Sequence, residues 1–460
     1  MESGLATIPT MNDHVAAVQR LRKTLAGNSR DGIAWHNLAA AEGDLGHAPE
    51  AESAARRAIA LGIQAPETHL VLARALQVQR RFDEADRAFE KAIRLRPGYV
   101  DAHRDLAQLA WMRTADATTA LRRVDGELRR DPRQPGLHLV RSIVLEFAND
   151  NASALEAAQA GLVIAATDVD LLRQAAHLSA NVGEPERALA LAHRALAVAP
   201  AAPDVRLSVC EALLACGRHA EATPLLEALR AQDPENQHIL AILALAWRLA
   251  GDPRYRELFD YGSLVEARYL DAAARTPDFL ARVVSGLQGM HQYEAHPLQQ
   301  SVRGGSQVTL EEADRDNAPL AGLFESIERA ASTYLARIGR GNDPMRSRNT
   351  GQFAISGAWS VRLRSGGYHA DHVHQKGWLS AVCYLSVPPR IGAGAQENDR
   401  AGWLRLGKPG IATRPPLPAE RHVKPEPGLV VLFPAYMWHG VEPFEDDAPR
   451  LSVAMDIVPV

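Results

Sequence analysis

Four side chains able to bind a metal ion or exchange a proton lie within six positions in the segment Gly366-Gly367-Tyr368-His369-Ala370-Asp371-His372-Val373-His374. The segment precedes an apolar stretch, Leu379 to Val387, that predicts a β-strand. Residues two apart on a strand share a face, so His372 and His374 can direct their rings at one cation while Val373 faces away. The pattern therefore offers two imidazole ligands from one strand.

A third candidate ligand and a candidate anion-binding residue come later in the chain. Pro427 to Pro434 predicts a turn and a strand, and His439 follows after a short link. Arg450 then opens a last predicted strand as Arg450-Leu451-Ser452. A guanidinium on a strand beside a metal site is suited to bind a carboxylate, because its donors form a fork that matches two oxygens.

These residues fall in a half of the chain that reads as a β-sheet. From about Asn349, short apolar or alternating runs are separated by Gly and Pro, which predicts an all-β core of roughly 110 residues. Helical patterns between Asp271 and Arg340, such as Pro319 to Ile338, are expected to buttress that sheet. The predicted strands are Gly357 to Leu363, Leu379 to Val387, Gly402 to Leu406, Leu429 to Phe433 and Leu451 to Val458.

The first half carries an internal repeat. Ala51 and Ala85 are 34 residues apart, and so are Ala188 and Ala222. Small alanines allow two helices to approach closely, and a proline at a common offset after Ala85 and Ala188 ends the second helix. This resembles the tetratricopeptide repeat family. Repeats are expected to begin near Gly32, Pro66, Val100, Pro135, Asp168 and Ala202, with a capping helix over Gln237 to Ala250.

The resemblance to tetratricopeptide repeats implies a superhelix whose concave face holds a peptide or another protein. Gly251, Asp252 and Pro253 interrupt the helical pattern. We therefore expect one domain over residues 1–252 and a second over residues 253–460, with its β core at about 349–460.

The second half resembles the Fe(II)/2-oxoglutarate oxygenase superfamily, whose double-stranded β-helix carries H-x-D, a distal His, and Arg or Lys about ten residues later. The closest likeness is to a bacterial group that combines tetratricopeptide repeats with the motif G-G-x-H-x-x-H-x-H-x-x-G-W-x-S, here Gly366 to Ser380. The likeness covers about residues 255 to 460 and includes Gln300 to Gln307. It implies an α+β multidomain protein with an N-terminal all-α superhelix and a C-terminal jelly roll buttressed by helices.

The resemblance assigns His372, His374 and His439 as ligands of Fe(II). It assigns Arg450 and Ser452 as the grip on the side carboxylate of 2-oxoglutarate. His374 stands where relatives carry Asp or Glu, yet imidazole is also a suitable ligand for Fe(II).

The sequence is also compatible with two other ligand sets. His369, Asp371 and His439 restore the H-x-D pattern, and a two-histidine site would resemble the aspartyl/asparaginyl hydroxylase group. A glycine six residues before the first ligand, here Gly366 before His372, favours the three-histidine set.

The function implied is a 2-oxoglutarate-dependent dioxygenase that hydroxylates a peptide or protein recruited by the repeats, with O₂ and 2-oxoglutarate as cosubstrates. The alternatives are a small-molecule biosynthetic oxygenase whose repeats bind a carrier or dimerise, and a non-catalytic repeat scaffold with a decayed metal site. Relatives often carry Tyr-Tyr where this chain has Cys383-Tyr384. Three tryptophans flank the site segments and could line a substrate pocket, although packing on the sheet is the simpler expectation: Trp378, Trp403 and Trp438.

Composition narrows the classes of partner. The net charge is only -4, with 46% hydrophobic and 23% charged residues, and there is no long run of Lys and Arg, so we expect neither nucleic acid nor a membrane as partner. Cys210, Cys216 and Cys383 show no pairing pattern, which favours a reducing compartment. With no leader pattern in the first 20 residues, the expected location is the cytoplasm.

Overall fold

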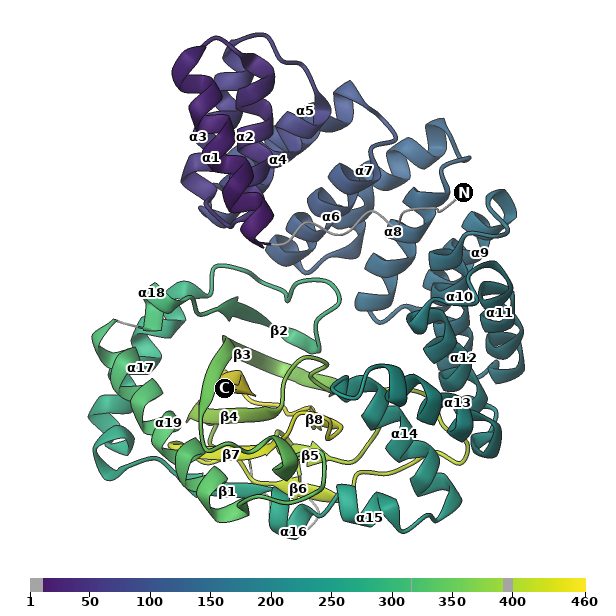
Figure 1. The fold of residues 1–460 in the computed structure, drawn as a ribbon, viewed down its shortest axis with the longest axis vertical. Helices are drawn as coiled ribbons and strands as arrows, with labels where there is room; N and C mark the ends of the chain where they lie inside the picture. Colours follow the sequence, from purple (N-terminus) through teal and green to yellow (C-terminus); the bar gives the residue numbers. More distant parts are fainter. Residues whose placement is uncertain (1–10, 316, 392–399) are drawn as a thin grey trace. The chain divides into compact units, whose positions relative to one another are not determined.

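The computed structural model describes residues 11–315, 317–391 and 400–460, and the chain divides into two compact units. The first unit contains residues up to Trp111 together with Asp116–Val144, and the second contains Met112–Ala115 and Leu145–Val460 (Figure 1). The second unit therefore combines the last repeat helices with the whole sheet. The sequence-based boundary near residue 252 stays a prediction. Part of the stretch from which no leader was expected, residues 1–10, lies outside the described residues.

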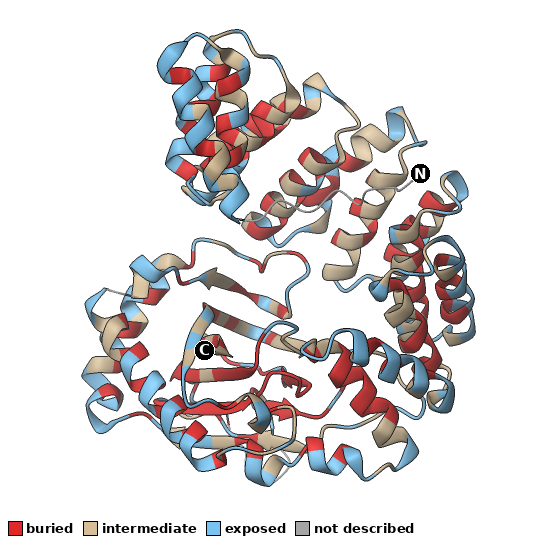
Figure 2. Ribbon diagram, viewed as in Figure 1, coloured by how far each residue is buried: buried red, intermediate tan, exposed pale blue. Residues whose placement is uncertain are grey.

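The first unit consists of helices joined by short turns. Its alanine-rich faces are buried, and Ala51 and Ala85 have no exposed surface, as close helix packing requires (Figure 2). The predicted repeat starts are confirmed, because Gly32, Pro66 and Val100 are the first residues of helices. These helices are α1 (Met11–Gly27), α2 (Gly32–Asp44), α3 (Ala48–Ala60), α4 (Pro66–Val78), α5 (Phe82–Leu95), α6 (Val100–Thr114), α7 (Ala117–Arg130) and α8 (Pro135–Phe147). The last three residues of α6 and of α8 belong to the second unit.

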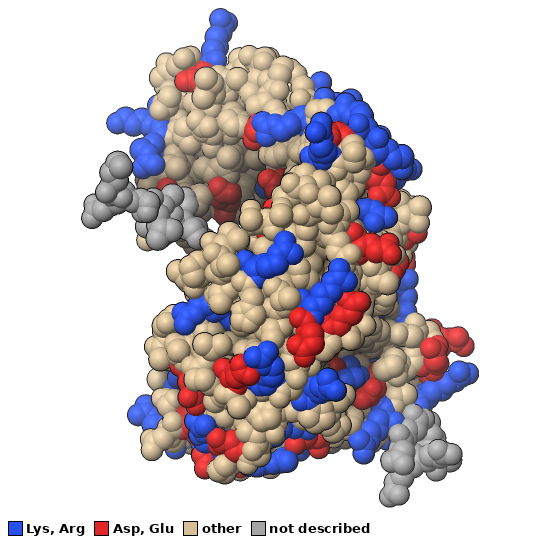
Figure 3. Space-filling view, turned by 90° about the vertical axis from the view of Figure 1, so that its right-hand side faces the viewer, with Lys and Arg blue, Asp and Glu red and all other residues tan. Residues whose placement is uncertain are grey.

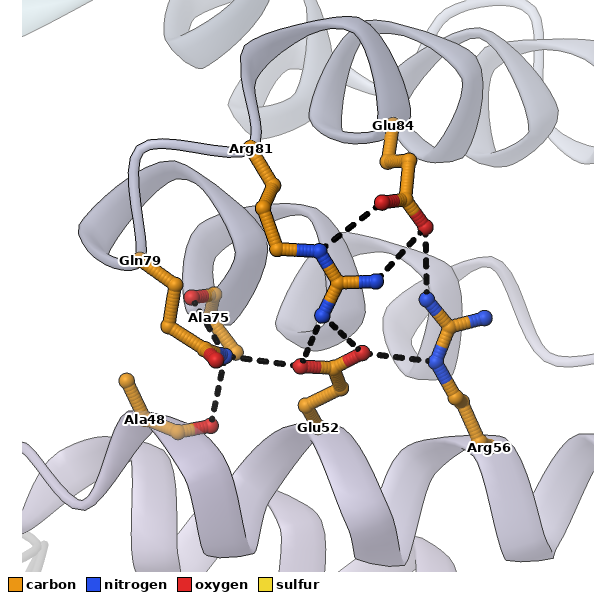
Figure 4. Close-up of polar contacts among 7 residues, drawn as sticks. All are labelled: Ala48, Glu52, Arg56, Ala75, Gln79, Arg81 and Glu84. Atoms are coloured by element: carbon orange, nitrogen blue, oxygen red, sulfur yellow. Dashed lines mark hydrogen bonds and ion pairs between the residues drawn. The ribbon is translucent and has the colours of Figure 1, made fainter.

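A network of charged side chains links two successive repeats in this unit (Figure 4). Nη1 of Arg81 donates to both carboxylate oxygens of Glu52, each at 2.7 Å, while Arg56 and Gln79 donate to Glu52 at 2.7 and 2.8 Å. Arg56 and Arg81 also bind Glu84. Burial acts to raise the pKa of Glu52, but these hydrogen bonds hold it below its ordinary value.

We expect Glu52→Ala to lower the free energy of unfolding of the first unit by about 1–3 kcal/mol, because several donors lose a charged acceptor. Denaturation followed by far-UV circular dichroism measures this loss. The difference from wild type is full above pH 4.5, the ordinary pKa of Glu, and vanishes as pH falls through the lowered pKa of Glu52. Glu50→Ala, at an exposed position of the same helix, is the control and should change stability by less than about 0.5 kcal/mol. Equal effects of the two variants would contradict the role given to the network.

The repeat helices of the second unit continue the same pattern. Asp168 and Ala202 precede the first residues of α10 and α12, and Gln237 begins α14, as the repeat period predicted. The sequence predicted α14 as a cap, and nine of its 14 residues are buried, including the unbroken run from Ile239 to Ala246. The helices are α9 (Asn151–Ile164), α10 (Val169–Asn181), α11 (Pro185–Val198), α12 (Pro203–Ala215), α13 (His219–Gln232) and α14 (Gln237–Ala250).

The rest of the second unit is built on an antiparallel sheet. The strands follow the order β1-β7-β4-β9-β3-β8-β5-β6, and β2 also pairs with β3. This nearly closed antiparallel arrangement is consistent with a jelly roll, and the predicted fold class is confirmed. The strands are β1 (Glu266–Tyr269), β2 (Val302–Thr309), β3 (Phe353–His372), β4 (Leu379–Ser386), β5 (Leu404–Leu406), β6 (Arg421–Val423), β7 (Leu429–Pro434), β8 (His439–Val441) and β9 (Arg450–Pro459).

The sheet extends beyond the region from which it was predicted. β1 and β2 precede residue 349. The sequence did not predict β2 as a strand, because Gly304 and Gly305 interrupt the alternation of apolar residues. Gly305 lies against the backbone of Arg362 in β3, where an added Cβ would approach the Arg362 carbonyl oxygen to 2.3 Å. Close contact between β2 and β3 therefore requires a glycine at this position.

Helices buttress the sheet, as the sequence predicted. α17 (Pro277–Met290) contacts β4, and α19 (Ala318–Ile338) contacts β7 (Figure 1). Three shorter α-helices complete the described part of this unit, namely α15 (Arg254–Leu258), α16 (Tyr261–Leu264) and α18 (Glu312–Arg315).

Charges are mixed over the face of the protein that Figure 3 presents, where Lys and Arg alternate with Asp and Glu. Within the described ranges, no helix combines the length and hydropathy needed to cross a membrane. The three cysteines are free, and burial raises the pKa of Cys210 and of Cys383 to about 12, which makes these thiols unreactive near neutral pH.

Candidate metal centre

Three of the histidines singled out from the sequence converge in the second unit. His372 ends β3, His439 begins β8, and the two are directly opposite partners in the antiparallel register. His374 follows two residues after His372, and its ring centroid lies 5.1 Å from that of His372 and 5.0 Å from that of His439. One nitrogen from each ring lies within 4.8 Å of the other two, a spacing at which one cation can contact all three.

Backbone carbonyl groups fix the tautomer of two of these rings. Nδ1 of His372 lies 2.9 Å from the carbonyl oxygen of Ala370, and Nδ1 of His439 lies 2.9 Å from that of Met437. A carbonyl can only accept, so each Nδ1 carries the proton and donates. Each Nε2 therefore keeps its lone pair, which is the form that binds a metal.

A carboxylate fixes the orientation of the third ring, that of His374. Nδ1 of His374 lies 2.5 Å from Oδ1 of Asp456, a residue of β9. Such a carboxylate orients the imidazole and leaves Nε2 as the nitrogen that can face a metal. None of the three candidate ligands is acidic. Asp456 nevertheless places a carboxylate in direct contact with one of them, His374.

The surroundings of the rings favour the form that binds metal. Burial, and next the neighbouring His374, lower the pKa of His372 to about 3, and burial with the neighbouring His372 places the pKa of His439 well below its ordinary value. Both rings are therefore neutral near pH 7. A metal ion entering the site does not have to displace a proton from either of them.

Asp371, the acidic residue of the alternative ligand set, contacts an arginine. The carboxylate of Asp371 forms a two-point ion pair with Arg405, with Nε–Oδ1 at 2.7 Å and Nη2–Oδ2 at 2.9 Å. His369 lines the same cavity with its ring centroid 6.0 Å from that of His372, and its Nδ1 lies 3.1 Å from the hydroxyl of Ser301, but it does not belong to the group of three nitrogens that could share one cation. The structure thus brings His372, His374 and His439 together, whereas Asp371 forms an ion pair with Arg405.

Arg450 places a buried positive charge near the histidines. The side chain is 1% exposed, its Nε has no hydrogen-bond partner among the described residues, and its Cζ lies 4.9 Å from the ring centre of Tyr384. Burial lowers the pKa of Arg450, the neighbouring Tyr384 opposes this, and no carboxylate contributes. A buried cation without a counter-ion is costly, so this guanidinium is well suited to hold an anionic ligand.

All five site residues predicted from the sequence line one cavity of about 480 Å³: His372, His374, His439, Arg450 and Ser452. The sequence did not single out Asp456, although it could have been found, because Arg450, Ser452, Ala454 and Asp456 alternate along β9 and all face the cavity. Other lining residues from separate elements include Phe147, Arg303, Trp359 and Tyr384.

The three tryptophans considered as pocket residues lie outside the set of described residues that lines this cavity. Trp378 and Trp438 are buried and donate from Nε1 to the carbonyl oxygens of Met345 and Ala241, at 2.9 and 3.3 Å. Trp359, on β3, is the tryptophan that borders the cavity. The sequence does not show which tryptophan borders the cavity, because that depends on how the strands pack in the folded protein.

Two segments of the chain match known families. Residues 357–456, which include the three histidines and Arg450, match the family described as "Putative 2OG-Fe(II) oxygenase". Residues 182–246 match the family described as "Tetratricopeptide repeat". No curated protein matches the chain.

Solved structures similar to part of the chain are repeat proteins. A chain of the Cut9–Hcn1 hetero-tetramer of the APC/C is 14% identical, with 52% of this chain and 46% of that chain covered and a TM-score of 0.38. A tetratricopeptide repeat protein of Thermus thermophilus is 24% identical, with coverages of 40% and 100% and a TM-score of 0.32. The pilF protein of Pseudomonas aeruginosa is 15% identical, with coverages of 45% and 95% and a TM-score of 0.35. This chain thus spans about half the length of the first of these structures.

We expect Asp456→Ala to weaken the binding of a divalent metal by about 10- to 100-fold, because His374 loses the acceptor that orients it. Titration of the metal-free protein with Co(II), followed by its visible absorption, gives the Kd. Asp446→Ala is the matched control, since Asp446 is also buried but accepts from the backbone N–H groups of Arg390 and Ala448. Equal losses of affinity in both variants would mean that general destabilisation, and not His374, is responsible.

Proposed function

Because the chain joins tetratricopeptide repeats to a 2OG-Fe(II) oxygenase domain, we propose that it is an Fe(II)- and 2-oxoglutarate-dependent dioxygenase that hydroxylates a peptide or protein. One observation carries the proposal. Three imidazoles share a cavity with the buried guanidinium of Arg450, whose Nε has no hydrogen-bond partner among the described residues. A cation site and an anion site in one cavity match a metal ion and a dicarboxylate.

The donor set fits Fe(II). Three neutral nitrogen ligands on one side of the cation leave its other positions open for a chelating cosubstrate and O₂. The set carries one negative charge fewer than a site with two histidines and a carboxylate. Asp456 offsets part of that difference through its hydrogen bond to His374.

Arg450 and its neighbours fit the far carboxylate of 2-oxoglutarate. Ser452 lies opposite Tyr384 in the register of β9 and β4, so a hydroxyl from each strand borders the same part of the cavity as the guanidinium. The hydroxyl of Tyr384 has no hydrogen-bond partner among the described residues and is available to a ligand. Arg450, Ser452 and Tyr384 would therefore hold one end of the dicarboxylate and aim its other end at the metal.

When bound, Fe(II) supplies the chemistry by which O₂ oxidises 2-oxoglutarate to succinate and CO₂ and adds the second oxygen atom to a substrate C–H bond. The side chains of this protein contribute binding and orientation. The histidines fix the position of the cation, Arg450 fixes the cosubstrate, and the apolar wall of the cavity limits access of water. Phe147 and Arg303 line the same cavity, with the Arg303 guanidinium 4.6 Å from the centre of the Phe147 ring, and would border a bound substrate.

A peptide or protein substrate is supported by the repeats, because arrays of this kind present extended surfaces for peptides and proteins. The proposal predicts that 2-oxoglutarate consumption rises when a peptide or protein fraction of a cell extract is added, with a mass gain of one oxygen in a peptide. A rise produced by the small-molecule fraction alone would favour a biosynthetic oxygenase instead.

We expect purified wild-type protein to bind one Fe(II) per chain and to form succinate from 2-oxoglutarate, and we expect His372→Ala, His374→Ala and His439→Ala to lose both. Arg450→Met should keep the metal but raise the KM for 2-oxoglutarate by at least about 10-fold, the cost of a lost charged hydrogen bond. Arg282→Met removes an arginine from the exposed face of α17 and is the control. Wild-type protein that binds no iron would instead indicate a repeat scaffold.

A further inference from the structure

Each of the three histidines has a neighbour in sequence that contacts repeat helix α14 or a segment held by α14. The first of these neighbours is Gln375, next to His374. Its carbonyl oxygen accepts a hydrogen bond from the backbone N–H of Gln237, the first residue of α14, at 3.2 Å. The first N–H groups of a helix have no partner within the helix, so this contact satisfies one of them and ties α14 to the chain beside His374.

The second neighbour is Trp438, next to His439. Its ring is 3% exposed, and its Nε1 donates to the carbonyl oxygen of Ala241 within α14 at 3.3 Å. The ring of His238, also on α14, meets the indole edge to face, with centroids 6.2 Å apart and an interplanar angle of 71°. Helix α14 therefore sets the position of the residue that precedes His439.

The third neighbour is Asp371, before His372, and its contact is indirect. Gly410 packs so closely on Asp371 that an added Cβ would lie 1.9 Å from the Asp371 carbonyl oxygen, and 3.0 Å from the Trp438 ring. Nη1 and Nη2 of Arg248 on α14 donate to the carbonyl oxygens of Gly407 and Pro418, at 2.7 and 2.9 Å. Arg248 thus holds both ends of the segment 407–418 that presses on Asp371.

The same segment also lies on an earlier repeat helix. The backbone N–H of Arg414 donates to the carbonyl oxygen of Leu214 in α12 at 3.1 Å. An added Cβ at Gly217, just after α12, would lie 3.1 Å from the carbonyl oxygen of Arg414. The segment 407–418 is therefore packed between repeat helices on one side and the residues next to the histidines on the other.

We propose that α14 is a positioning element of the metal centre, in which Trp438 and Arg248 act as positioning residues. This inference rests on the proposed function for the presence of a metal at the three histidines. Its consequence is that the last repeats do more than recruit a partner, because the spacing of the histidines depends on them. The long buried run of α14 fits this role, since the helix packs on α13 and also contacts the residues that flank the histidines.

The test uses the full-length protein, Co(II) as the probe and two mild substitutions. Trp438→Phe keeps an aromatic ring and removes the donor to Ala241, while Arg248→Lys keeps the charge but loses the planar fork whose two Nη groups donate to the carbonyl groups of Gly407 and Pro418. We expect each to raise the Kd for Co(II) by about 10-fold and to change the visible absorption of the bound ion, which reports its coordination geometry. The control is Arg254→Lys, because Arg254 forms its ion pairs with Asp252 and Glu227.

The melting temperature of each variant separates positioning from stability. A lower melting temperature with an unchanged Kd and an unchanged Co(II) spectrum in both variants would overturn the inference and leave the proposed function intact. Failure of the wild-type protein to bind Co(II) would overturn the proposed function, and the positioning role with it. A change of Kd and spectrum in both variants but not in Arg254→Lys supports the inference.

Discussion

The pairing of β3 with β8 is the contact on which the site depends, because it makes His372 and His439 direct cross-strand partners. His439 is buried and His372 is half-buried, and their ring centroids lie 4.2 Å apart, so two positive charges there would repel each other with little solvent to screen them. Backbone carbonyl groups at each Nδ1 remove the ambiguity of the tautomer. What remains is a set of nitrogen lone pairs within 4.8 Å of one another, the arrangement that the proposed metal site needs.

A second constraint is the buried charge of Arg450. Solvent does not compensate it, and within the described ranges no carboxylate influences its pKa. Arg405 shows the contrasting case, because Asp371 raises its pKa although burial acts to lower it. The domain thus contains one buried arginine that is satisfied by the protein and one that is left for a ligand. A fold tolerates a buried arginine without a counter-ion when ligand binding offsets the free energy lost by removing its charge from water.

The repeats and the oxygenase domain are more closely joined than their sequence families suggest. In the second unit, α14 serves both as the last repeat helix and as a wall behind the residues that flank the ligands. Arg248 is one example of this junction, because it lies on a repeat helix yet donates to the carbonyl groups of Gly407 and Pro418 and pairs with Glu420, all of which follow strand β5 in the sequence. Proteins built this way cannot be divided at a helix end without exposing the apolar surface of that helix.

Sequence alone determined what is periodic or local. The 34-residue repeat placed helix starts at Gly32, Pro66 and Gln237, and strand alternation put His372 and His374 on one face, since both patterns follow from backbone geometry. The family resemblance added His439 and Arg450. Only tertiary structure decided that Asp371 binds Arg405, that Asp456 supports His374 and that α14 packs beside the ligands. Those contacts join residues distant in the chain, and no local pattern encodes which distant partner a side chain meets.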